Sequence, residues 1–309
     1  MKLVSPADIE RAERRIRPYI RRTPLLAHSD TVTLKLEYLQ HGGSFKPRGA
    51  FNNLLCRQVP KVGVAAASGG NHGVAVALAA KQRNVPATIF VPEIASAAKI
   101  AAIRSAGANI RIGGARYSDA LAACTSFIAE SGALSIHAYD SVETIAGQGT
   151  LALEWDAQVD AGVDTVLVAV GGGGLIAGMA AWWRGSVKVI GVEPEGSRAL
   201  HAALQASMPV DVDVNSIAAD SLGAKRVGDL PMAIAKQLVE TVVLVSDAAI
   251  SDAQRTLWRD MRIAAEPGGA AAFAALQCGA YCPADGERVG ILVCGANVDL
   301  NSLAEHVVG

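Results

Sequence analysis

Short apolar runs alternate along most of the chain with longer segments whose apolar residues recur at helical spacing. We predict strands in the apolar runs and helices in the segments between them. The predicted strands are 62–67, 87–91, 109–112, 134–137, 165–170, 187–192, 241–245 and 288–293. The predicted helices are 74–81, 96–106, 118–130, 150–158, 175–183, 198–205, 231–239, 247–262 and 269–277. This alternation is typical of parallel sheets covered on both faces, so the predicted fold class is α/β.

The N-terminal part has a different pattern. Apolar residues at helical spacing predict a helix that Ser5-Pro6 opens and Thr23-Pro24 ends. Strict alternation over 31–38 then predicts a half-exposed strand, and 48–57 reads as a helix. The four βα units between 62 and 137 could form a subdomain of their own. Two segments lack a core period and are expected as turn or loop, namely 139–149 and 208–228.

Composition narrows the functional class. Hydrophobic residues make up 51% and charged residues 18%, which indicates a globular chain. The formal net charge is −1, so we expect no nucleic-acid partner, and the arginines of the first helix read as a solvated face. We expect no membrane span and no signal peptide. The five cysteines include no CxxC pair and suggest free thiols in a reducing cytoplasm.

Lys46 lies in the heptad Ser-Phe-Lys-Pro-Arg-Gly-Ala, between an aromatic ring and a proline and at the start of a predicted helix. A lysine that forms a Schiff base needs a partly desolvated, neutral amine, and this setting suits one. Taken alone, a lysine before a helix is more often a surface residue. The heptad therefore makes Lys46 a candidate that other parts of the chain must support.

Gly171, Gly172, Gly173 and Gly174 lie between a predicted strand and the helix that begins at Leu175. Successive glycines let backbone N–H groups converge in front of a helix N-terminus, which is an anion cradle. The run matches neither GxGxxG nor the Walker pattern. A tight turn is the alternative interpretation, but four glycines sacrifice so much backbone rigidity that we favour phosphate binding.

The run from Ser68 to Gly73 also joins a strand to a helix. Its hydroxyl, amide and backbone N–H groups suit a carboxylate or a phenolate oxygen of a cofactor, although a plain helix cap by Ser68 or Asn71 is the alternative. His72 alone would more often be structural. Cys294 follows the last strand and is a buried cysteine or a site residue. For three further acidic residues a structural or solvated role is as plausible, namely Glu193, Asp220 and Glu266.

Together these features supply a lysine, a phosphate cradle, a carboxylate loop and a neutral polar residue at strand ends, where sites of parallel sheets lie. Pyridoxal phosphate needs such groups: an amine for its aldehyde, an anchor for its phosphate and a partner for its pyridine nitrogen. The alternative from another class is a non-catalytic phosphate- or nucleotide-binding protein of doubly wound type.

The chain resembles the pyridoxal-phosphate fold type II enzymes, specifically the threonine/serine dehydratase and serine racemase group, from about Ser5 to Leu300. The resemblance rests on motifs spread along the chain: Arg22 to Leu25, Leu34 to Gln40, the Lys46 heptad, Ser68 to Gly73, Val91-Pro92, Gly171 to Leu175, Glu193-Pro194, Glu266-Pro267 and Cys294 to Asp299. It implies two parallel-sheet αβα domains. Residues 1–50 and 142–309 would form a large cofactor-binding domain, and 51–141 a small inserted domain that carries the carboxylate loop.

The resemblance also implies residue roles. Lys46 would bind pyridoxal 5'-phosphate through a Schiff base and remove the substrate Cα proton, with Phe45 near the ring. Backbone N–H groups would bind the phosphate from Gly171, Gly172, Gly173, Gly174 and Leu175. Asn71 would bond the phenolic oxygen, Cys294 would face the pyridine nitrogen, and Glu266 would hydrogen-bond into the site. The substrate carboxylate would lie against Ser68, Gly69, Asn71 and His72.

The implied activity is a lyase reaction: α,β-elimination that converts L-threonine or L-serine to a 2-oxo acid and ammonia. A thiol beside the pyridine nitrogen cannot keep it protonated, which favours loss of a β-substituent over reprotonation. In serine racemases a serine opposite the lysine acts as second acid/base, and Gly69 takes its place here. We therefore expect a dehydratase; a racemase, or an eliminase for another β-substituted amino acid, is the alternative.

Two further expectations follow from departures within the family pattern. Some relatives bind a divalent cation through a Glu side chain, a backbone carbonyl and an Asp side chain. Glu193 and Ser197 match the first two ligands, but Ala199 replaces the Asp. We therefore expect no metal. Asp220 is unusual at its position and could contact a polar or cationic substrate side chain. The expected partner is a small amino-acid substrate, and the resemblance suggests a cytoplasmic homodimer.

Overall fold

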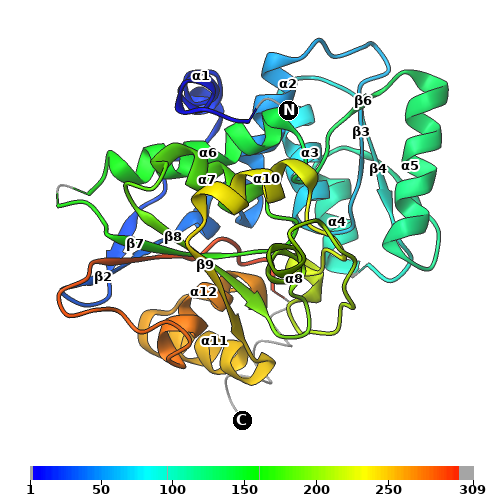
Figure 1. Cartoon of the computed structure of the whole chain (residues 1–309). Coiled ribbons are helices and arrows are strands. Elements are labelled where there is room, and N and C mark those ends of the chain that lie inside the picture. Colours follow the sequence, from blue (N-terminus) through cyan, green and yellow to red (C-terminus); the bar gives the residue numbers. More distant parts are fainter. Residues whose placement is uncertain (1–2, 96, 160, 299–309) are drawn as a thin grey trace.

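The computed structural model describes residues 3–95, 97–159 and 161–298 of the 309-residue chain (Figure 1). The strands are β1 (Leu25–Ala27), β2 (Val32–Lys35), β3 (Val64–Ala67), β4 (Ala87–Val91), β5 (Asn109–Ile112), β6 (Leu134–Ser135), β7 (Thr165–Ala169), β8 (Lys188–Pro194), β9 (Thr241–Val245) and β10 (Val289–Leu292). Short 3₁₀ turns follow α1 and precede α2, namely η1 (Arg17–Tyr19), η2 (Glu37–Leu39) and η3 (His41–Gly43).

The helices cover most of the rest of the described chain. They are α1 (Pro6–Ile16), α2 (Pro47–Cys56), α3 (Asn71–Gln82), α4 (Ala97–Ser105), α5 (Tyr117–Ser131), α6 (Val142–Asp156), α7 (Gly174–Trp183), α8 (Ala199–Ala206), α9 (Ala219–Leu222), α10 (Asp229–Leu238), α11 (Asp247–Met261) and α12 (Pro267–Gln277). Among the described residues, none of these helices combines the length and the apolar character needed to cross a membrane.

The strands form two sheets. One has the order β1-β2-β10-β7-β8-β9 and the other the order β5-β4-β3-β6. All neighbouring strands run parallel except the edge strand β1, which pairs antiparallel with β2. The predicted α/β class with parallel sheets is therefore confirmed, and β1 is an addition that its short, partly exposed segment did not signal.

Helices cover the two faces of the larger sheet, with α6 and α7 on one side and α11 and α12 on the other (Figure 1). In the smaller sheet, α5 packs against β3 and β4 on one face and α3 packs against them on the other. Helix α2 packs on both α3 and α6, so it joins the layers of the two sheets. Lys46 lies immediately before α2 and so stands where the two halves of the molecule meet.

Most predicted boundaries agree with the structure within a few residues, and β4, β5 and β9 agree fully. Helix α3 starts at Asn71 rather than at residue 74, so Asn71 and His72 occupy its first turn. The loop expected over 208–228 contains the short helix α9. Ser96, the first residue of one predicted helix, and the last motif residues Asp299 and Leu300 lie outside the described residues.

The turn predicted over 139–149 is wrong for its second part, because α6 begins at Val142 with Ser141 as its cap. Gly147 and Gly149 suggested a turn, but inside α6 they allow close packing. A Cβ on Gly147 would lie 2.6 Å from the Arg48 carbonyl oxygen, and one on Gly149 would lie 2.7 Å from that of Gly178. These glycines are therefore contact points of α6 with its neighbours, which local periodicity could not reveal.

The half-exposed strand predicted over 31–38 is also wrong in part. Strand β2 ends at Lys35, Glu37 begins a 3₁₀ turn, and both side chains are fully buried. They are buried because they meet opposite charges from α2 and α6. Lys35 Nζ donates to Glu154 Oε1 at 2.6 Å, and Arg48 Nε donates to Glu37 Oε1 at 2.6 Å. Lys35 and Glu37, the polar residues of the alternating segment, thus face a buried ion cluster instead of solvent.

Arg48 is the centre of this charge cluster, which we define as Lys35, Glu37, Arg48 and Glu154. Its Nη2 donates to Glu37 Oε2 at 3.0 Å and to Glu154 Oε2 at 2.8 Å. The cluster pairs two cations with two anions, and Thr23 Oγ1 adds a 2.6 Å hydrogen bond to Glu37. A buried charge is tolerated only when it is paired and hydrogen-bonded, and here each member is.

We expect Arg48→Met to lower the free energy of unfolding by about 3–5 kcal/mol, because it leaves the buried Glu37 carboxylate without its guanidinium. Urea denaturation followed by circular dichroism measures this. Arg17→Met is the matched control: its pair with Glu13 is exposed, so the loss should stay below about 0.5 kcal/mol. Equal losses in the two variants would contradict the prediction.

Candidate active site

Lys46 and Cys294 come together because the chain pairs just before α2 with the segment after β10. Ser44 and Gly295 form an antiparallel bridge, and Phe45 N donates to the Cys294 carbonyl at 3.1 Å. Strand β7 lies beside β10 and ends at the same edge, so the glycine run follows it there. The carboxyl ends of the parallel strands thus bring three predicted motifs to one place.

These motifs share one cavity. It is lined by Phe45, Lys46, Tyr139, Ala169, Val170, Gly171, Gly172, Gly173, Gly174, Leu175, Ile176, Ser221, Leu222 and Cys294. The structure therefore gathers Lys46, Phe45, the glycine run, Leu175 and Cys294, as the sequence suggested. It adds Tyr139, which the sequence analysis missed, and Ser221 and Leu222 from the segment 216–222, which the resemblance had placed near the substrate. Tyr139 comes four residues after β6 ends, so its place in the turn beyond a strand end was the signal that could have found it.

The Lys46 amine is desolvated although the side chain keeps some surface toward the cavity. Burial lowers its pKa from 10.5 to about 8, and the nearby Cys294 and Glu266 oppose this shift in part. Nζ donates to the Ala138 carbonyl at 3.1 Å and lies 4.9 Å from the centre of the Phe45 ring. A substantial fraction of this amine is neutral just above neutral pH, which is the state that attacks a carbonyl.

Cys294 presents a neutral thiol to the same cavity. Burial, helped by Glu266, raises its pKa to about 12, and its Sγ donates to the Gly268 carbonyl at 3.6 Å. The thiol therefore stays protonated over the physiological pH range. Such a group can share a hydrogen bond with a ring nitrogen but cannot stabilise a positive charge on it as a carboxylate does.

The glycine run offers an anion site. Within the described part of the chain, the backbone N–H groups of Gly171 to Leu175 donate to no protein acceptor, and the last two open α7. Gly173 has a φ of 88°, which a side chain would strain. A Cβ on Gly172 would lie 2.2 Å from Cδ1 of Tyr139. The glycines thus serve both the free N–H groups and the close approach of the Tyr139 ring.

Asn71 lies at the start of α3 and is held by two neighbours. Its Nδ2 donates to Glu266 Oε1 at 2.6 Å, and its Oδ1 accepts from Asn297 Nδ2 at 2.8 Å. Glu266 is buried, and burial raises its pKa while Lys99 opposes this shift. One N–H of the Asn71 amide is left for another acceptor, so the predicted contact with a cofactor oxygen is compatible with this geometry.

The predicted carboxylate loop, Asn71 included, does not contribute to the lining of the cavity, and neither does Glu266. Ser68 Oγ accepts from Gly70 N at 3.2 Å, and the His72 ring is buried with Nε2 2.9 Å from the Ile136 carbonyl oxygen. Burial and the nearby Lys46 lower the His72 pKa to about 3, so the ring is neutral. A Cβ on Gly69 would lie 2.7 Å from Ala95 Cβ, which gives a packing reason for this glycine.

Glu193 lies at the end of β8, away from the Lys46 cavity. Its carboxylate accepts from the backbone N–H groups of Leu200 and His201, both at 2.8 Å, at the start of α8. Burial raises its pKa to about 8. Among the described residues, His, Cys, Asp and Glu side chains gather nowhere in a group of three or more that could hold a metal.

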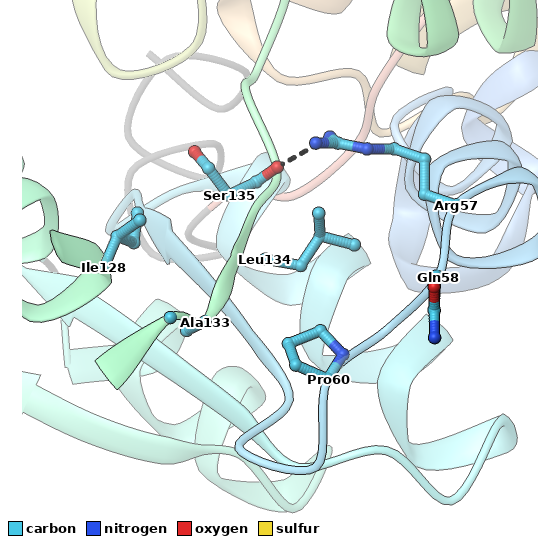
Figure 2. Close-up of a pocket in the computed structure, with 8 residues that line it drawn as sticks. Arg57, Gln58, Pro60, Ile128, Ala133, Leu134 and Ser135 are labelled. Atoms are coloured by element: carbon cyan, nitrogen blue, oxygen red, sulfur yellow. Dashed lines mark hydrogen bonds between the residues drawn. The ribbon is translucent and has the colours of Figure 1, made fainter. Parts of the chain in front are cut away.

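A larger cavity of about 440 Å³ lies elsewhere, between α2, α5 and β6 (Figure 2). Its walls are mainly apolar groups such as Pro60, Ile128 and Leu134, and Arg57 Nη1 already donates to the Ser135 carbonyl at 3.0 Å. The Lys46 cavity is narrower, about 40 Å³, because Tyr139 packs against Gly172. Among the described residues, the polar groups that converge on one point and could hold a ligand gather around Lys46, which favours that cavity as the site.

The groups around Lys46 fit pyridoxal phosphate. The buried, partly neutral amine suits the aldehyde, the N–H groups of the glycine run suit the phosphate, and the neutral thiol suits the pyridine nitrogen. The helix dipole of α7 adds a favourable field for a dianion at the same point. This fit rests on the donor set of the cavity, independent of any relative.

Comparisons with known proteins give relatives over nearly the whole chain. Phenylserine dehydratase of Ralstonia pickettii is 36% identical over 307 residues, covering 95% of this chain and 93% of that protein. L-threonine ammonia-lyase of Thermotoga maritima is 35% identical, covering 97% of this chain and 77% of that protein. The structure of maize serine racemase superposes with a TM-score of 0.91 at 34% identity, covering 99% and 98% of the two chains.

These neighbours confirm the predicted fold type II architecture. The family model described as pyridoxal-phosphate dependent enzyme matches residues 16–295, a range that includes Lys46, the glycine run and Cys294. The chain belongs to this family of pyridoxal-phosphate dependent enzymes.

Proposed function

We propose that this protein is an ammonia-lyase that converts L-threonine, L-serine or both to 2-oxobutyrate or pyruvate and ammonia. The observation that carries this proposal is the desolvated Lys46 amine, which shares one cavity with the free N–H groups of the glycine run and the neutral Cys294 thiol. Relatives named phenylserine dehydratase and L-threonine ammonia-lyase, both over most of the chain, support it.

The residue roles follow from the chemistry of each group. When bound, pyridoxal phosphate draws electrons from the substrate Cα and so makes its proton removable. The Lys46 amine holds the cofactor aldehyde at rest and accepts the Cα proton during the reaction. The N–H groups of Gly171 to Leu175 hold the phosphate, and Phe45 packs beside the ring. Cys294 faces the pyridine nitrogen without protonating it, which favours expulsion of the β-hydroxyl over return of the proton to Cα.

The start of α3 would receive the substrate carboxylate. The loop of Ser68, Gly69, Asn71 and His72 places backbone N–H groups at a helix N-terminus, which attracts an anion. Asn71 holds the cofactor's phenolic oxygen with its remaining amide hydrogen, and Glu266 fixes the orientation of that amide. With these groups the carboxylate and the cofactor oxygen would both be held from the first turn of α3, which would limit the movement of the substrate while Lys46 accepts the proton.

The division into domains follows from the same assignment. We propose that residues 51–141 form a small domain that carries the carboxylate loop, inserted in a large cofactor-binding domain of 1–50 and 142–309. The four strands of the smaller sheet all fall within the inserted segment, which supports this division. On the resemblance alone, we also propose a cytoplasmic homodimer. We propose no bound metal, because Ala199 replaces the third cation ligand of some relatives.

The main alternative is racemisation, which a structural relative titled as a serine racemase keeps open. A racemase needs an acid on the face opposite Lys46, and Gly69 offers none. The close packing of Gly69 against Ala95 supports elimination as the activity, because a side chain at position 69 would have to displace Ala95. Release of the oxo acid should therefore outpace formation of the D-isomer.

The role of Lys46 can be tested by spectroscopy and by substitution. The purified holoenzyme should absorb in the violet, and borohydride followed by peptide mapping should place the cofactor on Lys46. Lys46→Ala should lose this absorbance and lower oxo-acid release by a factor of about 10⁴ or more, because one group both attaches the cofactor and moves the proton. A colourless wild-type protein that Lys46→Ala leaves unchanged would favour a non-catalytic phosphate-binding protein.

The rate at which the cofactor attaches to Lys46 should depend on pH. Only the neutral Lys46 amine attacks the aldehyde, so recombination of apoenzyme with pyridoxal phosphate should speed up about tenfold per pH unit below pH 8. It should level off above about pH 8, because burial lowers the Lys46 pKa to about 8. Stopped-flow absorbance between pH 6 and 10 measures the rate. A rate that keeps rising to pH 10 would mean that the amine is solvated.

The residue on the face opposite Lys46 should decide between elimination and racemisation. Gly69→Ser alone should fold poorly around the carboxylate loop, because its Cβ would lie 2.7 Å from Ala95 Cβ. The double variant Gly69→Ser with Ala95→Gly removes this closest contact and leaves Val91 Cγ1 3.2 Å from the new Cβ. Its hydroxyl can return a proton to Cα, so the ratio of D-serine to pyruvate should rise about tenfold or more. Ala95→Gly alone is the control and should leave the ratio unchanged; a wild-type protein that already racemises faster than it eliminates contradicts the prediction.

A further inference from the structure

An ion pair joins the two halves of the molecule next to the proposed carboxylate loop. Lys99 of α4, in the half with the smaller sheet, donates from Nζ to Asp220 Oδ2 of α9. The two residues are separated by 121 positions in the sequence. The pair therefore depends on the tertiary fold and cannot be a local helix-surface contact.

The two partners differ strongly in exposure. The Lys99 side chain is 8% exposed, whereas that of Asp220 is 68% exposed. Moving the Asp220 carboxylate into water would cost little, because most of it is already hydrated. Taking the Asp220 carboxylate away from the Lys99 ammonium would cost more on the Lys99 side, because burial removes the hydration of the ammonium and lowers its pKa. Lys99 thus depends on the pair more than Asp220 does.

The pair lies at the substrate side of the Lys46 cavity. Ser221 and Leu222, which follow Asp220 directly, line that cavity. The Asp220 carbonyl oxygen is 3.4 Å from the place where a Cβ on Gly70 would stand, so α9 approaches the carboxylate loop. Glu266, which hydrogen-bonds Asn71, raises the Lys99 pKa electrostatically and so is close to its ammonium.

We propose that Lys99 binds a carboxylate of the substrate and that Asp220 occupies this position until the substrate arrives. The exchange replaces one carboxylate by another at the same ammonium, so the buried charge stays balanced while Asp220 turns to water. This gives Asp220 a different role from the contact with a cationic side chain that its sequence position suggested. The inference rests on the proposed function insofar as the bound anion belongs to an amino-acid substrate.

The carboxylate can come from two sources. One is the α-carboxylate, which Lys99 would then bind together with the start of α3, and the other is a second carboxylate on a dicarboxylic β-hydroxy amino acid, which Lys99 would bind alone. Succinate and butyrate separate these sources without any turnover, because both carry one carboxylate and only succinate carries a second. Their dissociation constants can be measured on the holoenzyme by titration calorimetry.

The variants Lys99→Met and Asp220→Asn should act in opposite directions. Lys99→Met removes the cation and should weaken succinate binding about tenfold or more. Asp220→Asn removes the competing anion and should tighten it severalfold. If the pair were only a latch between the two halves, both variants would weaken binding. Arg226→Met is the control, because its exposed pair with Asp211 lies on the same long loop and should leave binding unchanged.

The outcomes decide whether Lys99 binds a substrate carboxylate and which of the two carboxylates it binds. A loss in Lys99→Met for succinate and butyrate alike assigns the α-carboxylate, and a loss for succinate alone assigns a second carboxylate. Shifts of the same sign in the two variants, or none in either, overturn the proposal. Opposite shifts in an enzyme that releases no oxo acid from any amino acid would uphold the anion site while refuting the proposed reaction.

Discussion

The buried pairing of Arg48 with Glu37 and Glu154 is the contact on which the position of Lys46 depends. Arg48 lies two residues after Lys46, and its guanidinium meets carboxylates from the segment after β2 and from α6. Because each partner would be strongly destabilised alone, these segments have one low-energy arrangement. The start of α2 is therefore fixed in both position and direction, and Lys46 faces the cavity as a consequence.

Glycine contacts complete what the charge cluster begins. Gly147 lets α6 approach the backbone of α2, and Gly172 and Gly174 let the loop before α7 close against Tyr139. The same residues thus control how closely α2, α6 and α7 approach one another and where free N–H groups remain at the end of β7. A larger side chain at these points would separate the amine from the anion site, which ties packing directly to the chemistry of the cavity.

The sequence predicted the α/β class and the strand-end location of Lys46, the glycine run and Cys294, because strand periodicity and glycine clusters are local signals. It could not predict that Lys35 and Glu37 are buried, because alternation normally marks an exposed face and the partner of Lys35, Glu154, lies 119 positions away. It missed the start of α6 because the glycines there serve tertiary contacts. Tyr139 and Lys99 escaped notice because their significance depends on neighbours from other parts of the chain.

Electrostatics around Lys46 supports one direction of proton flow. His72 is neutral because burial lowers its pKa to about 3, and Cys294 is neutral because burial raises its pKa to about 12. Neither exchanges a proton readily near neutral pH, whereas the Lys46 amine, with a pKa of about 8, does. In the proposed reaction, with Gly69 on the opposite face, Lys46 would carry the proton taken from the substrate Cα. Elimination needs a base on only one face of the substrate, whereas racemisation needs a second acid/base group on the opposite face.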